Sequence, residues 1–187
     1  MRLFVAIDVD REARERLVAE QRRVRSLVGD ASSLKWTAEE LMHVTLVFIG
    51  NVPDARGDEV LAAAAESITG VGPFRAVFGG LGIFPPRGAP RVLWAGVIEG
   101  AEQMARVREV VKGRVGQLGL PTEDRPFHAH VTLGRWRDGR PRDRRAVEDI
   151  RGSDRIAFCE VREAALYQSR LSSSGPAYTV LARSRLT

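Results

Sequence analysis

His43-Val44-Thr45-Leu46 is repeated further along the chain as His130-Val131-Thr132-Leu133. The chain has 187 residues and only three histidines, and two of these begin the repeated tetrapeptides. Because a β-strand sends successive side chains to opposite faces, each copy would turn its His and Thr to one side and its Val and Leu to the other. The apolar side can be buried in a core, while the imidazole and the hydroxyl stay available for proton transfer and for binding an oxyanion.

The surroundings of the two tetrapeptides predict a duplicated chain. An apolar run at residues 3–7 and a helical stretch at residues 11–28 precede the first copy. A similar run at residues 92–97 and a helical stretch at residues 101–118 precede the second. Equivalent points lie 87 to 90 residues apart. In both helical stretches the apolar residues recur at the spacing of one helix face, which is typical of a helix packed on a core.

The similarity continues beyond the tetrapeptides. Helices with Pro in their first turn are predicted at residues 53–68 and 141–150. Each is followed by a run rich in β-forming residues, at 74–84 and at 156–167. A last strand is expected at residues 177–186, added to the second half. We therefore expect an α+β fold of two βαβαβ-like halves, each with the His-Val-Thr-Leu strand in the same place.

The length of the chain allows a substantial core, formed either by one domain or by two small lobes. No linker is long enough to separate independent domains, and the Gly- and Pro-containing segment 79–90 is the expected junction between the halves. We expect a single bilobal domain over residues 1–187, with lobe-forming halves at about 1–88 and 89–187.

The composition favours a soluble cytoplasmic protein. A single cysteine, Cys159, excludes an internal disulfide, and its apolar surroundings predict a buried thiol. No run is long enough to cross a bilayer, and Asp8 and Asp10 interrupt the first apolar run, which is not typical of a signal peptide. The net charge of +5 and the pI near 10.3 are compatible with a polyanionic partner. The densest basic segment, residues 135–142, directly follows the second tetrapeptide.

Two such strands facing each other would form a symmetric pocket with two imidazoles and two hydroxyls. This arrangement suits in-line attack at phosphorus, in which the nucleophile and the leaving group lie on opposite sides. One imidazole would remove a proton from the attacking water, and the other would protonate the departing oxygen. The hydroxyls of Thr45 and Thr132 would bind phosphate oxygens as negative charge develops.

The repeated motifs and their surroundings resemble a known family. The resemblance is carried by the two His-x-Thr-x motifs, by the start Met1-Arg2-Leu3-Phe4-Val5-Ala6-Ile7, and by the stretches at 41–50, 91–97, 125–135, 166–169 and 175–178. These features look like the two-histidine (2H) phosphoesterase superfamily. Within it the chain resembles the RNA 2′,3′-cyclic phosphodiesterases, also called 2′-5′ RNA ligases. One departure is Ala129, where relatives commonly carry Pro.

The resemblance implies a bilobal, pseudo-two-fold fold with the active site in a central cleft. It implies hydrolysis of RNA 2′,3′-cyclic phosphate ends to 2′-phosphomonoesters without a metal or another cofactor, and the reverse 2′-5′ ligation. His43 would be the proton donor and His130 the proton acceptor, with Thr45 and Thr132 as further catalytic residues. We expect a monomer whose partner is RNA ending in a 2′,3′-cyclic phosphate, with no membrane association.

Three further residues are predicted to bind substrate: Arg135, His128 and Trp36. A regular strand would turn Arg135 away from the cleft, so the phosphate role that the family pattern favours requires a bend at Gly134. His128 is expected at the pocket edge. Trp36 could stack on a nucleobase or pack in the core, whereas core packing is the default expectation for Phe84.

Two other functions remain open on the sequence alone. His128 and His130 have the spacing of neighbours on one strand face, and with His43 they could form a zinc site. The protein would then be a zinc-dependent phosphohydrolase. A non-catalytic RNA-binding module is the second alternative, although such a module would have no need of two spaced imidazoles.

Overall fold

The structure is a computed structural model that describes residues 1–187 except 29–32, 124–125, 151–152 and 173–174. Its strands are β1 (Arg2–Asp8), β2 (Leu34–Trp36), β3 (His43–Asn51), β4 (Phe74–Phe84), β5 (Val92–Glu99), β6 (His130–Trp136), β7 (Ala157–Val161), β8 (Glu163–Ser172) and β9 (Gly175–Arg185). Its helices are α1 (Arg11–Val28), α2 (Gly57–Ala65), α3 (Ala101–Gln117) and α4 (Pro141–Glu148), with short 3-10 turns η1 (Glu39–Leu41) and η2 (Asp54–Arg56). The mixture of helices and strands confirms the predicted α+β class.

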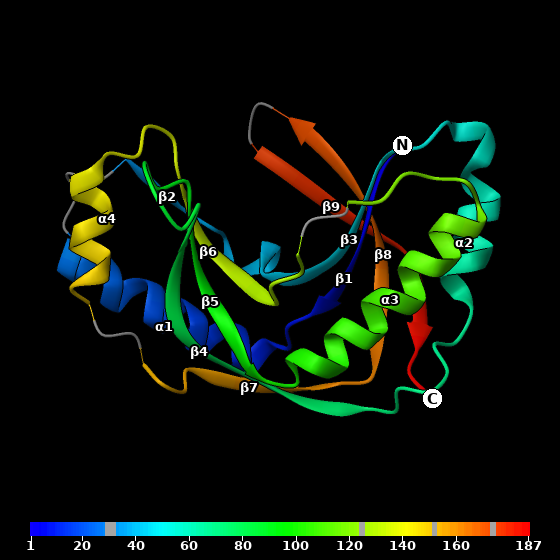
Figure 1. Ribbon diagram of the computed structural model, residues 1–187, viewed down its shortest axis with the longest axis horizontal. Coiled ribbons are helices and arrows are strands. Elements are labelled where there is room, and N and C mark those ends of the chain that lie inside the picture. The colour runs from blue at the N-terminus through cyan, green and yellow to red at the C-terminus, as the bar shows by residue number, and fades with distance from the viewer. Residues whose placement is uncertain (29–32, 124–125, 151–152, 173–174) are drawn as a thin grey trace.

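The strands of the described residues form one antiparallel sheet in the order β7-β4-β5-β6-β3-β1-β8-β9, and β2 pairs with the C-terminal part of β6. The strands of the two tetrapeptides, β3 and β6, are neighbours at the middle of this sheet (Figure 1). One residue pair joins them, Val44 with Val131. A pseudo-two-fold axis between these valines relates β6-β5-β4-β7 on one side to β3-β1-β8-β9 on the other.

The two sides of the sheet are not the two halves of the sequence. β4 belongs to the first half but pairs with β5 and β7 of the second half, and β8 of the second half pairs with β1. The strand order therefore differs from the expected lobes of residues 1–88 and 89–187. The reason is local, because only residues 85–91 separate β4 from β5, and so short a connection favours an antiparallel hairpin. β9 pairs with β8, so it also lies on the side of β1.

The two long helices pack against different strands of the sheet and share one hydrophobic core. α1 packs against β7 and α4, whereas α3 packs against β3 and α2. Both bury most of the apolar stripe that the periodicity predicts: Ala13, Leu17 and Val24 in α1, and Met104, Val107, Val111 and Val115 in α3. Leu27, which the periodicity also places on the stripe of α1, is instead 59% exposed. α2 is shorter than predicted and begins only after the 3-10 turn η2, and α4 ends at Glu148.

Gln21 ties α1 to the second tetrapeptide. Its side-chain Nε2 donates to the carbonyl oxygens of Leu133 and Thr37, each at 2.8 Å. The carbonyl of Leu133 belongs to β6, so this buried amide fixes the strand relative to the helix. Such a contact also explains why a polar side chain is buried at this point of α1, since both of its donors are satisfied.

The side chains of the tetrapeptides alternate as predicted. The apolar members are buried: Val44, Leu46, Val131 and Leu133. The histidines and threonines of both copies are partly exposed. The apolar face of each strand thus belongs to the core, and the polar face is accessible.

Cys159 is buried in β7, as its apolar surroundings predict. Loss of solvent raises the pKa of its thiol to about 11, so the sulfur stays protonated at neutral pH. Among the helices of the described chain, none is both long and apolar enough to span a membrane.

Candidate active site

His43 is the first residue of β3, and two hydrogen bonds fix its ring. Its Nδ1 lies 2.8 Å from the carbonyl oxygen of Leu41, and its Nε2 lies 3.0 Å from Oγ1 of Thr45. A carbonyl oxygen can only accept a hydrogen bond, so Nδ1 carries a hydrogen in both the neutral and the charged ring. Proton exchange is therefore confined to Nε2.

His130, the first residue of β6, is held in the same way. Its Nδ1 lies 2.7 Å from the carbonyl oxygen of His128, two residues earlier, just as Leu41 stands two residues before His43. Nε2 is again the atom that can exchange a proton. The duplication therefore extends from the sequence to the tautomer of each ring.

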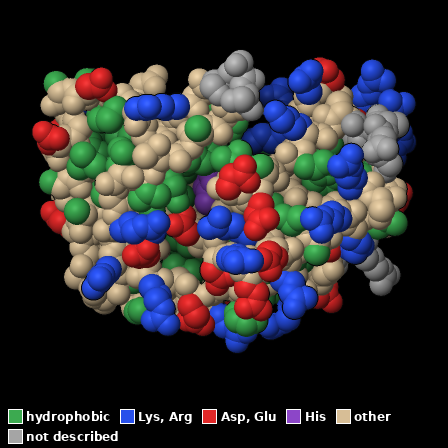
Figure 2. Space-filling model, turned by 180° about the vertical axis from the view of Figure 1, so that it is seen from behind, with side chains coloured by type: hydrophobic (Ala, Val, Ile, Leu, Met, Phe, Trp, Pro, Cys, Tyr) green, Lys and Arg blue, Asp and Glu red, His purple; other side chains and the backbone are tan. Residues whose placement is uncertain are grey.

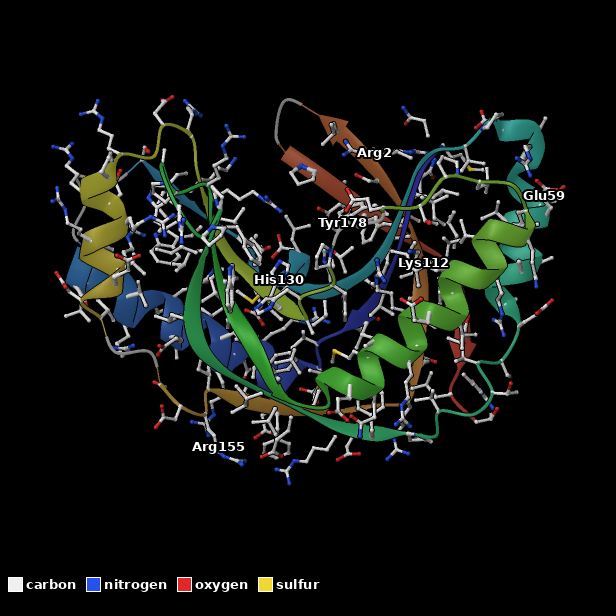
Figure 3. The ribbon with its side chains drawn as sticks, viewed as in Figure 1. Arg2, Glu59, Lys112, His130, Arg155 and Tyr178 are labelled. Atoms are coloured by element: carbon white, nitrogen blue, oxygen red, sulfur yellow. The ribbon has the colours of Figure 1, made fainter. Side chains whose placement is uncertain are left out.

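The two imidazoles lie on the same face of neighbouring strands. Because β3 and β6 run antiparallel through the pair Val44–Val131, this register brings His43 beside Thr132, and His130 beside Thr45. The rings influence each other, since the charge of His130 lowers the pKa of His43. Figure 3 shows His130 near the middle of the molecule, between its two sides. Figure 2, seen from behind, shows histidine atoms at the surface near the middle of that face.

Burial is the main influence on both imidazoles. Loss of solvent lowers the pKa of His43 and the pKa of His130 below the usual value for histidine. The hydrogen bond to a backbone carbonyl acts in the opposite direction on each ring, and the positive charge of Arg135 adds to the lowering in both. The charge of Arg135 thus reaches both rings.

A β-bulge turns Arg135 to the face of the histidines. Consecutive residues of β5 oppose Gly134 and Thr132, so Leu133 is the extra residue of β6. Beyond it the alternation is shifted by one position, and Arg135 is exposed while Trp136 is buried. Arg135 can bind phosphate only if the strand bends after the second tetrapeptide, and this bulge provides the bend.

The first repeat contains the same bulge with a different residue beyond it. Consecutive residues of β1 oppose Val47 and Thr45, so Leu46 is the extra residue of β3. Phe48 is thereby turned outward, 42% exposed, at the position equivalent to Arg135. The pseudo-symmetric pocket is therefore cationic on the β6 side and apolar on the β3 side.

Aromatic rings surround His43. Its ring centroid lies 5.1 Å from that of Phe4 on β1, 5.4 Å from that of Tyr178 on β9 and 6.3 Å from that of Tyr167 on β8. The sequence reasoning missed both tyrosines, because they reach His43 only through the pairing of β8 with β1. Residues 166–169 and 175–178 belong to the stretches that resemble the family, and this resemblance was the one signal in the sequence that could have pointed to these tyrosines.

A second aromatic group lies against His130. Its ring centroid is 5.1 Å from that of Phe84, 6.0 Å from that of Trp94 and 6.2 Å from that of His128. His128 also packs edge-on against Trp94 at 4.5 Å. His128 is exposed at the edge of this group, and Phe84 is only partly buried beside it rather than wholly in the core.

Asp8 faces His43 from the neighbouring strand. The two residues are direct partners in the pairing of β1 with β3, and the side chains of such partners point to the same face. The carboxylate accepts hydrogen bonds from the hydroxyl of Tyr167 and, at 3.0 Å, from Nη1 of Arg183. Its negative charge raises the pKa of His43, against the larger effect of burial. The sequence reasoning missed this role as well, since the register of β1 against β3 is not visible locally.

Trp36 lies on the other face of the sheet. β2 pairs Trp36 with Gly134 and Lys35 with Arg135. Lys35 therefore shares the face of Arg135, whereas Trp36 and Leu34 pack against the hydrophobic core. This position does not support the predicted stacking of Trp36 on a nucleobase.

Within the described residues, no group of three or more His, Cys, Asp or Glu side chains is placed to hold a metal ion. The ring of His128 packs edge-on against Trp94. The arrangement therefore gives no support to the zinc site that the spacing of His128 and His130 suggested.

Comparisons with known proteins point to one family. The model of the 2′-5′ RNA ligase superfamily matches residues 9–172. The RNA 2′,3′-cyclic phosphodiesterase of Archaeoglobus fulgidus is 37% identical over 180 residues, which are 95% of this chain and 96% of that protein. The RNA 2′,3′-cyclic phosphodiesterase of Aquifex aeolicus is 34% identical over 185 residues, which are 97% of this chain and 95% of that protein.

Solved structures share the fold over the same length. The protein TT0787 of Thermus thermophilus superposes with a TM-score of 0.81 and 32% identity, covering 99% of this chain and 97% of its own. E. coli LigT in complex with 3′-AMP superposes with a TM-score of 0.77 and 25% identity, covering 100% of this chain and 98% of its own. Both similarities therefore include the two sides of the sheet.

Proposed function

The chain belongs to the 2′-5′ RNA ligase superfamily, and we propose that it hydrolyses RNA ends that carry a 2′,3′-cyclic phosphate. The observation that carries this proposal is the placement of His43 and His130 on the two adjacent central strands, each with Nε2 as its exchanging atom. Relatives that match nearly the whole chain are named for this activity.

The geometry suits the chemistry of a cyclic phosphate. A 2′,3′-cyclic phosphate is a strained five-membered diester with one negative charge. Hydrolysis requires water to attack phosphorus on the side opposite to the departing ribose oxygen, with a base for the water and an acid for the oxygen. Two imidazoles on neighbouring strands can serve both sides of one phosphorus atom, and they need no metal ion to do so.

We assign His43 as the acid and His130 as the base. Asp8, the partner of His43, favours its protonated form, whereas Gly96 stands at the equivalent place opposite His130. Burial and the charge of Arg135 favour the neutral form of His130 that a base requires. With the 3′ oxygen as the leaving group, the product is a 2′-phosphomonoester. The same steps in reverse join RNA ends through a 2′-5′ linkage.

The threonines and Arg135 hold the phosphate in this proposal. Thr45 and Thr132 share the face of the imidazoles and can donate to the non-bridging oxygens as charge develops. In the free protein the hydroxyl of Thr45 already contacts Nε2 of His43, so it changes partner when phosphate binds. Arg135 supplies a positive charge on the same face for the anionic diester.

The proposed site is complete within one chain, since both imidazoles, both threonines and Arg135 lie on β3 and β6. We propose that the protein acts as a monomer, since this site needs no residue from a second copy. We further propose that it acts on cellular RNA in the cytoplasm.

The deciding experiment is incubation with a short RNA that ends in a 2′,3′-cyclic phosphate, followed by mapping of the product phosphate. We expect a 2′-phosphate from the wild-type protein and none from His43→Ala or His130→Ala. A 3′-phosphate would overturn the assigned leaving group. Binding of the RNA without turnover would instead identify a non-catalytic RNA-binding module.

A further inference from the structure

Arg135 is one end of a row of exposed basic residues that leads away from the imidazoles. Its cross-strand partner on β2 is Lys35, so both side chains lie on the face that carries His130. Arg137 follows two positions later, and its N–H donates to the carbonyl oxygen of Ser33, just before β2. The row continues to the start of α4. We call it the basic strip: Lys35, Arg135, Arg137, Arg140 and Arg142.

The side chains of the basic strip are not held in ion pairs; the nearby carboxylate of Asp143 accepts instead from the backbone N–H of Arg140. All five side chains are exposed, and no ion pair between described residues involves any of them. Arg144 on the same helix differs, because it pairs with Glu148 and donates to the carbonyl of Gly88. Figure 3 shows nitrogen-tipped side chains around α4 and β2. The strip therefore offers free donors for an anion.

The duplication supplies an internal comparison for these charges. Residues 87 positions apart are equivalent around the two tetrapeptides. At the position equivalent to Arg135, just beyond the β-bulge, the first repeat carries the uncharged Phe48. Arg135 therefore adds to the β6 side of the site a positive charge that the equivalent place on the β3 side lacks.

We propose that the basic strip binds the sugar–phosphate backbone of the RNA body while the terminal cyclic phosphate lies between the imidazoles. This inference rests on the proposed function and adds a direction to it: the nucleotides before the terminal one leave the site over β2 and the start of α4. Exposed Lys and Arg side chains that contact backbone phosphates give affinity that does not depend on base sequence and that falls with salt. RNA length, rather than base identity, then decides how well a substrate is used.

The opposite side of the site offers a competing path. Arg2 on β1 is exposed, and it alternates with Phe4, which contacts His43, so it points to the same face. Figure 3 shows Arg2 near Tyr178 on this side. Arg2→Gln is therefore the variant that separates the two directions.

The test compares two substrates, an octaribonucleotide ending in a 2′,3′-cyclic phosphate and 2′,3′-cyclic AMP, in the wild type and in the double variant Lys35→Gln/Arg137→Gln. At low salt we expect kcat/KM for the octanucleotide to fall about tenfold in the double variant, and kcat/KM for the mononucleotide to change by less than about twofold. The slope of log kcat/KM against log salt for the octanucleotide should become shallower by roughly 1.4, since each single-strand phosphate contact contributes about 0.7.

Arg16→Gln, at an exposed position of α1, is the control for a lower net charge and should leave both substrates unaffected. The proposal is overturned by equal losses for both substrates, by no loss for either, or by a loss for the octanucleotide in Arg2→Gln instead. If the wild type hydrolyses neither substrate, the proposed function fails. RNA binding by the basic strip is then tested separately, by measuring the affinity for an octanucleotide ending in a 3′-phosphate with fluorescence anisotropy. Unchanged affinity in the double variant then overturns it, and a loss of about tenfold supports it.

Discussion

Asp8 and His43 are direct partners across β1 and β3, whereas Gly96 holds the equivalent position opposite His130. The two histidines therefore have the same place on their strands and the same tautomer, but their electrostatic surroundings differ. The carboxylate is fixed by the hydroxyl of Tyr167, and its charge favours a protonated His43. A symmetric pocket could use either imidazole as the acid. The carboxylate of Asp8 breaks this symmetry and favours His43 as the acid.

Asp8→Asn should move the alkaline limb of the pH–rate profile to lower pH. Without the carboxylate charge, protonated His43 is less favourable, so the pKa of His43 falls further below its usual value. The alkaline limb reports loss of the proton from the acid, and the acidic limb reports protonation of the base. The measurement is kcat/KM for a 2′,3′-cyclic mononucleotide as a function of pH. A shift of the acidic limb alone would show that His43 is the base.

Tyr167→Phe is the matched control for the lost charge. It removes the hydroxyl that donates to Asp8 but keeps the carboxylate and the ring stacked on Phe4. Burial and the neighbouring carboxylate raise the pKa of Tyr167, so its phenol stays neutral over the range of the assay. The alkaline limb should therefore move much less than in Asp8→Asn. An equal shift would attribute the effect to altered packing instead of charge.

A leaving group that needs no protonation should separate the roles of the two imidazoles. Loss of a general acid or base costs roughly a hundredfold to ten-thousandfold in rate with an ordinary ribose leaving group. With an analogue in which a nitrophenolate takes the place of the 3′ oxygen on a 2′-linked phosphate, such as the 2′-(nitrophenyl phosphate) of a 3′-deoxynucleoside, His43→Ala should recover a large part of its rate, because a nitrophenolate departs without a proton. His130→Ala should not recover, since the water still needs a base. Equal recovery of both variants, or recovery of His130→Ala alone, would contradict the assignment.

The faces of the two tetrapeptides were predictable from sequence because alternation along a strand is a local property. His43 and Thr45 share a face through their spacing alone, as do His130 and Thr132. Arg135 depended on more than spacing. A regular strand turns it away, and the bulge that returns it is defined by the pairing of β6 with β5.

Contacts between distant segments were beyond the reach of the local pattern. Tyr167 and Tyr178 contact His43 because β8 pairs with β1. This pairing joins a strand of the second half of the sequence to the sheet side of the first half, just as β4 of the first half pairs with β5. Trp36 shows the opposite case. Its place shortly before the first tetrapeptide suggested stacking on a nucleobase, but its pairing with Gly134 turns the side chain to the core.

Hydrolysis should continue in excess EDTA. The acid, the base and the oxyanion donors of the proposed site are all side chains, so no cation is required. The measurement is the rate with and without chelator, together with the metal content of the purified protein. His128→Gln serves as a second arm, and it should leave the chelator response unchanged. Activity that disappears with EDTA and returns with zinc would restore His128 and His130 as metal ligands.

Gly82→Ala should disturb the His130 side of the site through Trp94. A Cβ at Gly82 would lie 2.0 Å from Cζ2 of the indole, so the ring would have to move. The same ring contacts His128 and His130. Overpacking of this kind costs about 1–3 kcal/mol in the free energy of unfolding. We expect a lower unfolding temperature and a lower kcat/KM.

Gly113→Ala is the matched control for this substitution. Gly113 is an exposed residue inside α3, and an added Cβ would meet nothing within 4 Å. Alanine is more stable than glycine within a helix by about 0.5–1 kcal/mol, so the unfolding temperature should rise while turnover stays the same. If Gly82→Ala behaved like Gly113→Ala, the position of the Trp94 ring would not depend on the glycine beneath it.

Thr45→Val and Thr132→Val should slow turnover while the fold stays intact. Valine keeps the branched shape and the β-propensity of threonine, so the unfolding temperature should change little. Each variant removes a hydroxyl that donates to a phosphate oxygen as its charge increases. Loss of a dedicated oxyanion donor costs about 2.7–4 kcal/mol of transition-state stabilisation, and less where water can replace it.

The serine variants test whether the hydroxyl itself is responsible. Thr45→Ser and Thr132→Ser keep the donor and should lose far less activity than the valine variants. Thr45 also lies 3.0 Å from Nε2 of His43, so Thr45→Val should in addition change the pH dependence of the acid. The measurement is kcat and its pH profile for all four variants beside their thermal unfolding. Turnover near the wild-type rate in both valine variants would make the threonines ordinary strand residues, and the phosphate would have to be bound elsewhere on the face that His43 and His130 share.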